Sequence, residues 1–406
     1  MTAEELRKEF PSLERRIESR PLVYFDNAAT SMRPISVVEF LKDSNINHNA
    51  NIHRAVHLLA VEATEAYEAS REQVRKFLGA ASRDEIIFTS GTTAAINLVS
   101  YSFAERYLQK GDEVIVGVSE HHSNFVPWQI QCQRKGVTIK YLYPGKRGVY
   151  ETQDLKQLLS EKTRLVCIGH SSNVLGIVNP LTQLIALSHS AGAKVLVDGA
   201  QGAVHRKVDV QALDCDFYAF SAHKLFGPTG VGVLYGKKQL LEEMPPFMYG
   251  GEMVGTVSTN GTTFAPLPQK FEAGTQNFIN VAALVPALVL FDKVLQDKEL
   301  NEQFNITEAY LQRALKNIDG LHLWGDDDTD KLPIYSFTID GVHHEDLAIL
   351  LDKMGVAVRS GQMCAEPLMT HCGVTGMVRA SLLQYNTVQE AEYFVKSLER
   401  AIGMLR

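Results

Sequence analysis

The sequence has few cysteines, no basic tract and no long hydrophobic run. Five cysteines occur among 406 residues; their number is odd and none are spaced as Cys-x-x-Cys, so neither a disulfide framework nor a zinc site is expected. The 40 basic residues are outnumbered by 47 acidic ones, which argues against nucleic acid or an anionic membrane as a partner. The apolar runs are far shorter than a membrane span, and the charged N-terminus lacks the apolar core of a signal peptide. These absences predict a globular protein of the reducing cytoplasm, without a metal site.

The chain length predicts more than one hydrophobic core. A chain of 406 residues exceeds what one core usually supports, which favours a large domain plus a smaller one. The hydrophobic share of 45% and the charged share of 21% are typical of folded domains. We expect residues 1–20 to pack with the small domain, residues 21–290 to form the large domain and residues 291–406 to form the small one.

Apolar strand-like segments alternate with helical ones through the first half of the chain. Strands are expected at "DEIIFTS", "DEVIVGV", "VTIKYLY", "RLVCIGH" and "AKVLVDG". This alternation predicts an α/β fold with a mainly parallel sheet covered by helices on both faces. From about residue 290 the pattern changes to that of a smaller α+β domain. Open α/β sheets bind ligands at the carboxyl ends of their strands, so the site is expected there.

Lys224 stands at one such strand end, in "FYAFSAHKLFGPTG", among apolar, small and turn-forming residues. Lysine is rarely buried without a partner, so its side chain either snorkels to the surface or is a desolvated, reactive amine that forms a Schiff base. This stretch alone leaves both interpretations open.

Other strand ends carry polar residues. Gly91, Thr92 and Thr93 would suit a phosphate at a helix N-terminus, although such a junction is more often a simple cap. Asp198 follows an apolar strand and is costly there unless it pairs with a cation, so it either caps the next helix or binds a protonated ring nitrogen.

Two further strand ends carry His121 with His122, and Asn173. Adjacent histidines point to different sides, which favours one ring facing the site over a metal held by both. A phosphate cup, an aspartate for a pyridinium nitrogen, a histidine for ring stacking and a lysine for an aldehyde are together the parts of a pyridoxal phosphate site. That assignment explains Lys224.

Several longer motifs carry a family resemblance. They are "YFDNAATS", "NIHRAVH", "EHHSNFVPWQ", "VDGAQ", "SAHKLFGPTGVGVLYG", "FEAGTQN" and "RSGQMCAEPLM". On these motifs the sequence resembles the aminotransferase class V family, and within it the group II (SufS-type) cysteine desulfurases and selenocysteine lyase-like enzymes. The resemblance implies a pyridoxal phosphate-dependent enzyme of fold type I, with a seven-stranded, mainly parallel sheet, a smaller α+β C-terminal domain and a homodimeric assembly.

The resemblance also implies a role for each matching residue. Lys224 would bind the cofactor aldehyde, and His121 would stack on the ring. The further cofactor contacts are expected from Thr92, Thr93, Asp198, Gln201, Ser221 and His223, and from Thr275 reaching into the partner subunit. Substrate contacts are expected from His53, Asn173, Arg359 and Arg379. Arg379 would clamp the substrate carboxylate with two hydrogen bonds; without the motifs, a surface ion pair is the ordinary interpretation of either arginine.

One cysteine is the expected nucleophile. Cys132, Cys167 and Cys215 lie in helix or strand patterns and fit small buried hydrophobes. Cys364 lies in the loop "RSGQMCAEP", five residues after Arg359, and a nearby cation favours the thiolate. Cys372, also near a turn, is the alternative thiol.

The implied reaction converts L-cysteine into L-alanine and leaves a persulfide on Cys364, which passes to a SufE- or SufU-like acceptor protein for iron–sulfur cluster assembly. A selenocysteine lyase would use the same site with less dependence on Cys364. A class V aminotransferase, epimerase or kynureninase-like enzyme would share Lys224 and Asp198 without needing the thiol. A non-enzymatic scaffold would tolerate loss of the nucleophile, which is retained here.

The loop departs from the family pattern in one place. Gln362 and Met363 stand where related enzymes often carry a histidine pair, and neither side chain carries a proton near neutral pH. We therefore expect low basal activity and stimulation by the acceptor.

Overall fold

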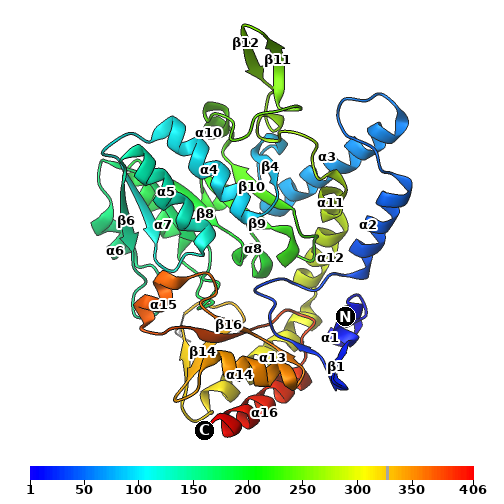
Figure 1. The fold of residues 1–406 in the computed structure, drawn as a ribbon, viewed down its shortest axis with the longest axis vertical. Coiled ribbons are helices and arrows are strands. Elements are labelled where there is room, and N and C mark those ends of the chain that lie inside the picture. The colour runs from blue at the N-terminus through cyan, green and yellow to red at the C-terminus, as the bar shows by residue number, and fades with distance from the viewer. Residues whose placement is uncertain (326–328) are drawn as a thin grey trace.

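The computed structural model describes residues 1–325 and 329–406. Its larger part, in the upper half of Figure 1, is built on a seven-stranded sheet with the strand order β4-β10-β9-β8-β7-β5-β6. The strands are β4 (Ile86–Thr89), β5 (Glu113–Gly117), β6 (Thr138–Leu142), β7 (Thr163–Gly169), β8 (Lys194–Asp198), β9 (Phe217–Ser221) and β10 (Gly232–Gly236). Only β10 runs antiparallel to its neighbours, β4 and β9. The predicted mainly parallel, seven-stranded sheet is confirmed.

The strands of this sheet are buried on both faces. In β9, Phe217 and Ala219 belong to one apolar cluster, whereas Tyr218 and Phe220 belong to another, because successive side chains of a strand point to opposite faces. Residues of α4 (Thr92–Tyr107), α5 (Val126–Lys135) and α10 (Lys238–Glu243) complete the first cluster. Residues of α3 (Leu58–Leu78), α7 (Leu181–Ser190) and α12 (Leu284–Gln296) complete the second. Because helices cover both faces of the sheet, nearly every side chain along these strands is apolar.

The stretch Phe278–Gln296 is apolar and long enough to cross a membrane by length and composition, with a mean hydropathy of 1.9. It comprises α11 (Phe278–Ala282) and α12, which pack against α3 and α2 (Ile35–Asn47). Leu284, Leu288 and Phe291 are fully buried in the core. We therefore assign the stretch to two helices of the fold that bury one face in its core. The shorter helices of this part are α6 (Thr152–Leu158), α8 (Gly202–His205) and α9 (Val210–Leu213).

A second, four-stranded sheet forms the core of the C-terminal part, in the lower half of Figure 1. Its strands, in spatial order, are β13 (Leu321–Trp324), β14 (Ile334–Ile339), β17 (Met377–Ser381) and β16 (Arg359–Gly361). The helices of this part are α13 (Lys298–Lys316), α14 (His344–Lys353), α15 (Glu366–Cys372) and α16 (Val388–Leu405). Apolar residues of α13, α14 and α16 pack with this sheet in one cluster, which gives the expected smaller α+β unit.

The two parts are joined at more than one place. The strand β3 (Val23–Tyr24) pairs in parallel with β15 (Val356–Ala357), which brings the N-terminal segment to the C-terminal part. Within α1 (Ala3–Arg7), Arg7 forms an ion pair with Glu390 at 2.9 Å. The expected boundary at residue 290 lies inside α12, which ends at Gln296. The next residue, Asp297, caps the N-terminus of α13 with its side chain.

A two-stranded hairpin projects from the top of the molecule in Figure 1. It consists of β11 (Val254–Ser258) and β12 (Gly261–Phe264). Both strands are exposed, including the apolar side chains of Val257 and Phe264. A short pair of strands, β1 (Arg16–Ile17) and β2 (Arg20–Pro21), lies near the N-terminus.

Candidate active site

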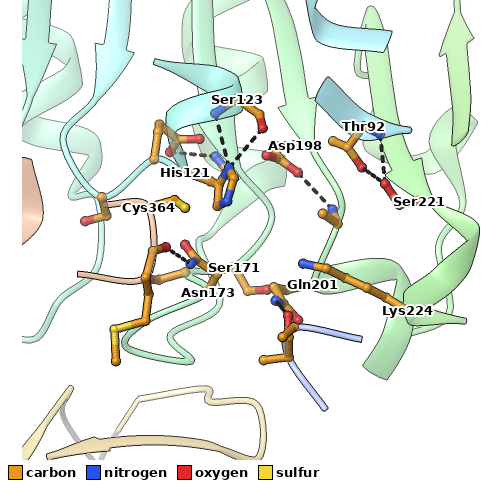
Figure 2. A pocket seen from close by; sticks show the side chains of 18 of the residues that line it. Thr92, His121, Ser123, Ser171, Asn173, Asp198, Gln201, Ser221, Lys224 and Cys364 are labelled. Carbon is orange, nitrogen blue, oxygen red and sulfur yellow. Dashed lines mark hydrogen bonds between the residues drawn. The ribbon is translucent and has the colours of Figure 1, made fainter. Parts of the chain in front are cut away.

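A cavity of about 260 Å³ lies at the carboxyl ends of β5, β7, β8 and β9, and the loop that carries Cys364 forms part of its wall. Figure 2 shows Lys224 and Cys364 reaching this cavity from opposite sides. The predicted site residues that line it are Thr92, Thr93, His121, Asn173, Asp198, Gln201, Ser221, His223, Lys224, Arg359, Cys364 and Arg379. Two predicted residues, His53 and Thr275, do not line it.

Lys224 lies in a single 3-10 turn directly after β9, and its side chain extends into the cavity (Figure 2). Burial lowers the pKa of the amine to about 8; Asp198 opposes this shift and Arg379 adds to it. A lysine with this pKa is about one-tenth free, nucleophilic base at pH 7, far more than a lysine with an ordinary pKa. The geometry therefore favours the desolvated amine over a lysine that snorkels to the surface.

Asp198 ends β8 and is buried in the cavity wall. Its Oδ1 accepts a hydrogen bond from the Ala200 N–H at 2.9 Å, as drawn in Figure 2. Burial raises the pKa of this carboxyl, and the Ala200 hydrogen bond and the Lys224 charge oppose that rise. A cation placed against the carboxylate would offset the cost of its burial.

The turn before α4 forms a polar cup beside the cavity. The hydroxyl of Ser221 accepts a hydrogen bond from the Thr92 N–H at 2.8 Å and lies 2.7 Å from the Thr92 hydroxyl. A Cβ on Gly232 would come within 2.4 Å of the Gly91 Cα, so this close approach of β10 requires glycine. Hydroxyls together with the free N–H groups of a helix N-terminus form a cup that suits a phosphate.

The two adjacent histidines face different surroundings, as expected. Nδ1 of His121 accepts from the Ser123 N–H at 3.1 Å, and burial lowers the His121 pKa to about 4. The ring is therefore neutral at pH 7 and carries its proton on Nε2. His122 instead lines a separate hollow. Its backbone N–H donates a hydrogen bond to the backbone carbonyl of Cys364 at 2.8 Å. Within residues 1–325 and 329–406, no group of three or more His, Cys, Asp or Glu side chains is placed to hold a metal ion.

The thiol of Cys364 is exposed on a loop with unusual backbone geometry. Met363 and Cys364 both have positive φ angles, of 48° and 55°, which non-glycine residues rarely adopt. The side chain of Asn173 donates to the Met363 carbonyl at 2.8 Å, and the Met363 side chain is buried in an apolar cluster with Leu368. These contacts hold the loop against the cavity.

The remaining thiols lie in different environments. Cys132, Cys167 and Cys215 are buried and Cys372 is half-buried. Burial raises the pKa of each of these four thiols, which disfavours the reactive thiolate. Cys364 is the thiol that both is exposed and lines the cavity.

Arg359 and Arg379 lie on the paired strands β16 and β17, directly opposite each other in the register. Both pair with Asp26: Arg359 Nη2 lies 2.6 Å from Asp26 Oδ2, and Arg379 Nη2 lies 3.3 Å from Asp26 Oδ1. Arg379 is almost fully buried, with 3% of its surface exposed, so this arrangement is not an ordinary surface ion pair.

His53 and Thr275 lie away from the cavity of their own chain. His53 has a positive φ of 71°, and its N–H donates to the Thr64 hydroxyl at 2.9 Å. Its ring makes a T-shaped contact with the ring of Tyr67, with centroids 5.6 Å apart. Thr275 is exposed and follows the buried Glu272.

Six polar residues that line the cavity were not predicted from the sequence: Ser119, Glu120, Ser123, Ser171, Ser172 and Asn179. Asp26, which pairs with both arginines of the cavity, was not predicted either. Glu120 is buried in the cavity wall and accepts hydrogen bonds from the Asn124 amide at 2.6 Å and the Gly169 N–H at 2.8 Å. Burial raises its pKa to about 8. Glu120 follows an apolar strand, as Asp198 does. The argument that identified Asp198 would therefore also have identified Glu120.

The residues around the cavity fit pyridoxal phosphate. A desolvated amine (Lys224) and a buried carboxylate (Asp198) share the cavity with a neutral imidazole (His121). The cup of hydroxyl and N–H groups at the start of α4 adjoins them. These groups match the aldehyde, the ring nitrogen, the ring face and the phosphate of that cofactor.

The mainly parallel seven-stranded sheet, the smaller α+β unit and the lysine at a strand end define a protein with the type I fold of pyridoxal phosphate-dependent enzymes. A family model, aminotransferase class V, matches residues 23–394. The chain belongs to the aminotransferase class V family, and the predicted resemblance is confirmed.

Similar proteins cover the chain from end to end. A probable cysteine desulfurase of Halalkalibacterium halodurans is 44% identical over 400 residues, which is 98% of each chain. A cysteine desulfurase of Cronobacter sakazakii is 43% identical and covers 99% of this chain and 98% of its own. Among solved structures, the cysteine desulfurase CsdA (S-sulfonic acid) from Escherichia coli is 39% identical with a TM-score of 0.90, and 100% of both chains is covered. An apo cysteine desulfurase from Thermococcus onnurineus is 32% identical with a TM-score of 0.92, over 100% of this chain and 99% of its own.

Proposed function

We propose that this protein is a pyridoxal phosphate-dependent cysteine desulfurase that converts L-cysteine into L-alanine. One observation carries the proposal: the exposed thiol of Cys364 and the desolvated amine of Lys224 line one cavity. An aminotransferase or epimerase needs the lysine but has no use for a thiol facing it. The relatives named cysteine desulfurase, at 42–44% identity over nearly the whole chain, support the same activity.

The cofactor contacts are distributed around the cavity. Asp198 would pair with the ring nitrogen, His121 would stack on the ring and Gln201 would contact the phenolic oxygen. The phosphate would be held by Thr92, Thr93, Ser221 and His223. Bound there, pyridoxal phosphate supplies an electron sink for the α-carbon of an amino acid.

The side chains of this chain then have separable tasks. Arg379 binds the substrate carboxylate through its guanidinium group. The backbone carbonyl of Asn173 accepts a hydrogen bond from Arg379 Nη1 at 2.8 Å and keeps that guanidinium in place. The Lys224 amine, with a pKa of about 8, takes the α-proton as a general base. The neutral His121 ring can donate a hydrogen bond from Nε2.

Cys364 acts on the sulfur. Its thiolate attacks the sulfur atom of L-cysteine, the substrate's carbon–sulfur bond breaks, and a sulfur–sulfur bond forms at Cys364 Sγ. The carbon skeleton takes up a proton at the β-carbon, regains the α-proton from Lys224 and leaves as L-alanine. Arg359 lies on the strand that leads into this loop. Because the Cys364 side chain is exposed, a SufE- or SufU-like acceptor could collect the persulfide sulfur for iron–sulfur cluster assembly in the cytoplasm.

The site is proposed to be shared between two subunits of a homodimer. Thr275 is exposed and does not line the cavity of its own chain, so its expected phosphate contact would be made in the partner subunit. The segment that carries His53 also exposes Val56 (97%) and Leu58 (70%). Apolar side chains gathered on one exposed segment indicate a surface that another protein chain covers.

The decisive experiment incubates the purified protein with L-cysteine and a reductant and measures sulfide and alanine. Equal amounts of both products are expected, and none from Lys224→Ala or Cys364→Ala. Transamination of L-cysteine without sulfide would overturn the proposal. Parallel assays with L-selenocysteine distinguish a cysteine desulfurase from a selenocysteine lyase. The lyase would stay active after Cys364→Ala.

A further inference from the structure

Asp26 is a carboxylate shared between the two arginines of the cavity. Its Oδ2 lies 2.6 Å from Arg359 Nη2, and its Oδ1 lies 3.3 Å from both Arg359 Nε and Arg379 Nη2. The Asp26 side chain is 14% exposed, against 48% for that of Arg359 and 4% for that of Arg379. The more exposed arginine therefore holds Asp26 with two contacts, and the buried arginine holds it with one longer contact.

One edge of the Arg379 guanidinium lacks part of its hydrogen bonds. Nη1 donates a hydrogen bond to the backbone carbonyl of Asn173 at 2.8 Å. Nε is buried and has no hydrogen-bond partner among residues 1–325 and 329–406. Nε and Nη2 form one edge of the planar fork, and a carboxylate binds such an edge with two parallel hydrogen bonds. An incoming carboxylate would satisfy Nε and, at Nη2, would meet the like charge of Asp26, so the two carboxylates would compete for this arginine.

We propose that Asp26 is a positioning residue that occupies Arg379 before substrate binds and is transferred to Arg359 when a substrate carboxylate arrives. Arg359 already makes the shorter contact, so Asp26 remains paired after it releases Arg379. A carboxylate ligand therefore competes with Asp26 for Arg379, whereas a neutral ligand leaves the Asp26–Arg379 pair intact. This inference rests on the proposed function for its substrate, an α-amino acid.

The test uses two thiol ligands that lack an amino group. 3-Mercaptopropionate carries the carboxylate, and 3-mercaptopropionamide is its neutral counterpart of the same shape. Their dissociation constants are measured by titration calorimetry on the cofactor-loaded enzyme, which requires no turnover. Asp26→Asn is expected to tighten 3-mercaptopropionate binding about ten-fold, equivalent to about 1.4 kcal/mol, without tightening binding of the amide. Asp84→Asn, which removes a carboxylate from an exposed ion pair with Lys238, is the control and should change neither constant.

A second variant tests the transfer itself. Arg359→Gln leaves Asp26 with Arg379 alone, so 3-mercaptopropionate should bind more weakly than to the wild type. In the double variant, Asp26→Asn should abolish that penalty, a non-additivity expected of coupled residues. Independent, multiplying effects of the two substitutions would overturn the proposal, as would unchanged or weaker binding in Asp26→Asn. Asp26→Ser repeats the measurement should the asparagine variant fail to fold. Absence of sulfide and alanine from the wild-type enzyme would overturn the proposed function instead, while the calorimetry would still decide the role of Asp26.

Discussion

Arg71 and Glu272 form an ion pair in the interior of the large part, with Arg71 Nη1 2.8 Å from Glu272 Oε1. Their side chains are 0% and 2% exposed. Glu272 also accepts hydrogen bonds from the Tyr67 hydroxyl at 2.9 Å and the Phe88 N–H at 2.7 Å. The pair therefore fixes the start of the segment that leads to Thr275.

Breaking this pair should be costly. Arg71→Met leaves the Glu272 carboxylate buried without its cation, which should lower the free energy of unfolding by about 3–5 kcal/mol. Arg147→Met removes an exposed pair with Glu151 and should cost at most about 1 kcal/mol. Urea denaturation of the two variants measures both values, and equal losses would contradict the structural role assigned to Arg71.

Incorporation of pyridoxal phosphate into the cofactor-free protein should depend on pH through Lys224. The pKa of about 8 means that the amine is protonated below pH 8 and becomes nucleophilic above it. The rate should rise about ten-fold per pH unit below pH 8 and level off above it. Yellow absorbance records the rate, and Lys224→Ala should form no adduct that borohydride can reduce. A rate still rising steeply up to pH 10 would show an amine with an ordinary lysine pKa.

Persulfide formation should depend on Cys364 and not on Cys372. Cys364→Ala should bind the cofactor and still change its spectrum with L-cysteine, yet form no persulfide detectable by mass spectrometry. Cys372→Ala should retain at least about half of the wild-type activity, because this half-buried thiol does not line the cavity. The reverse pattern would identify Cys372 as the nucleophile.

Mixed dimers test whether the site is shared. Lys224→Ala and Thr275→Ala subunits, mixed in equal amounts, should regain about one quarter of the wild-type activity, because half of the dimers would hold one intact site. Mixing Lys224→Ala with Cys364→Ala is the control: both residues line the cavity of one chain, so no site is restored. Inactive Lys224→Ala/Thr275→Ala heterodimers would contradict a contribution from the partner subunit.

The positions before the nucleophile should respond differently to histidine. Met363 is buried in an apolar cluster, so Met363→His should lower stability by about 1–3 kcal/mol. Gln362 is exposed, so Gln362→His should be neutral within about 0.5 kcal/mol and should speed both alkylation of Cys364 by iodoacetamide and basal turnover. Thermal denaturation and alkylation rates check the two effects. Unchanged alkylation in Gln362→His would show that residue 362 does not act on the thiol.

The sequence by itself indicated six of the seven strands of the large sheet, all except β10, and the polar residues at the strand ends. Lys224, Asp198 and Thr92 were found because each follows a short apolar segment, and local pattern alone decides that placement. Glu120 follows the same pattern, although it was not predicted from the sequence. The pattern does not show which buried carboxylates have hydrogen-bond partners.

Only the tertiary structure decided what closes the site. Asp26 meets Arg359 across 333 residues of sequence, and Cys364 faces Lys224 because the C-terminal part packs over the ends of the parallel strands. Periodicity records which face of an element is buried, but it does not record which distant element covers that face. The pairing of β3 with β15 depends in the same way on contacts between distant segments. These contacts form only when the two parts of the chain pack together.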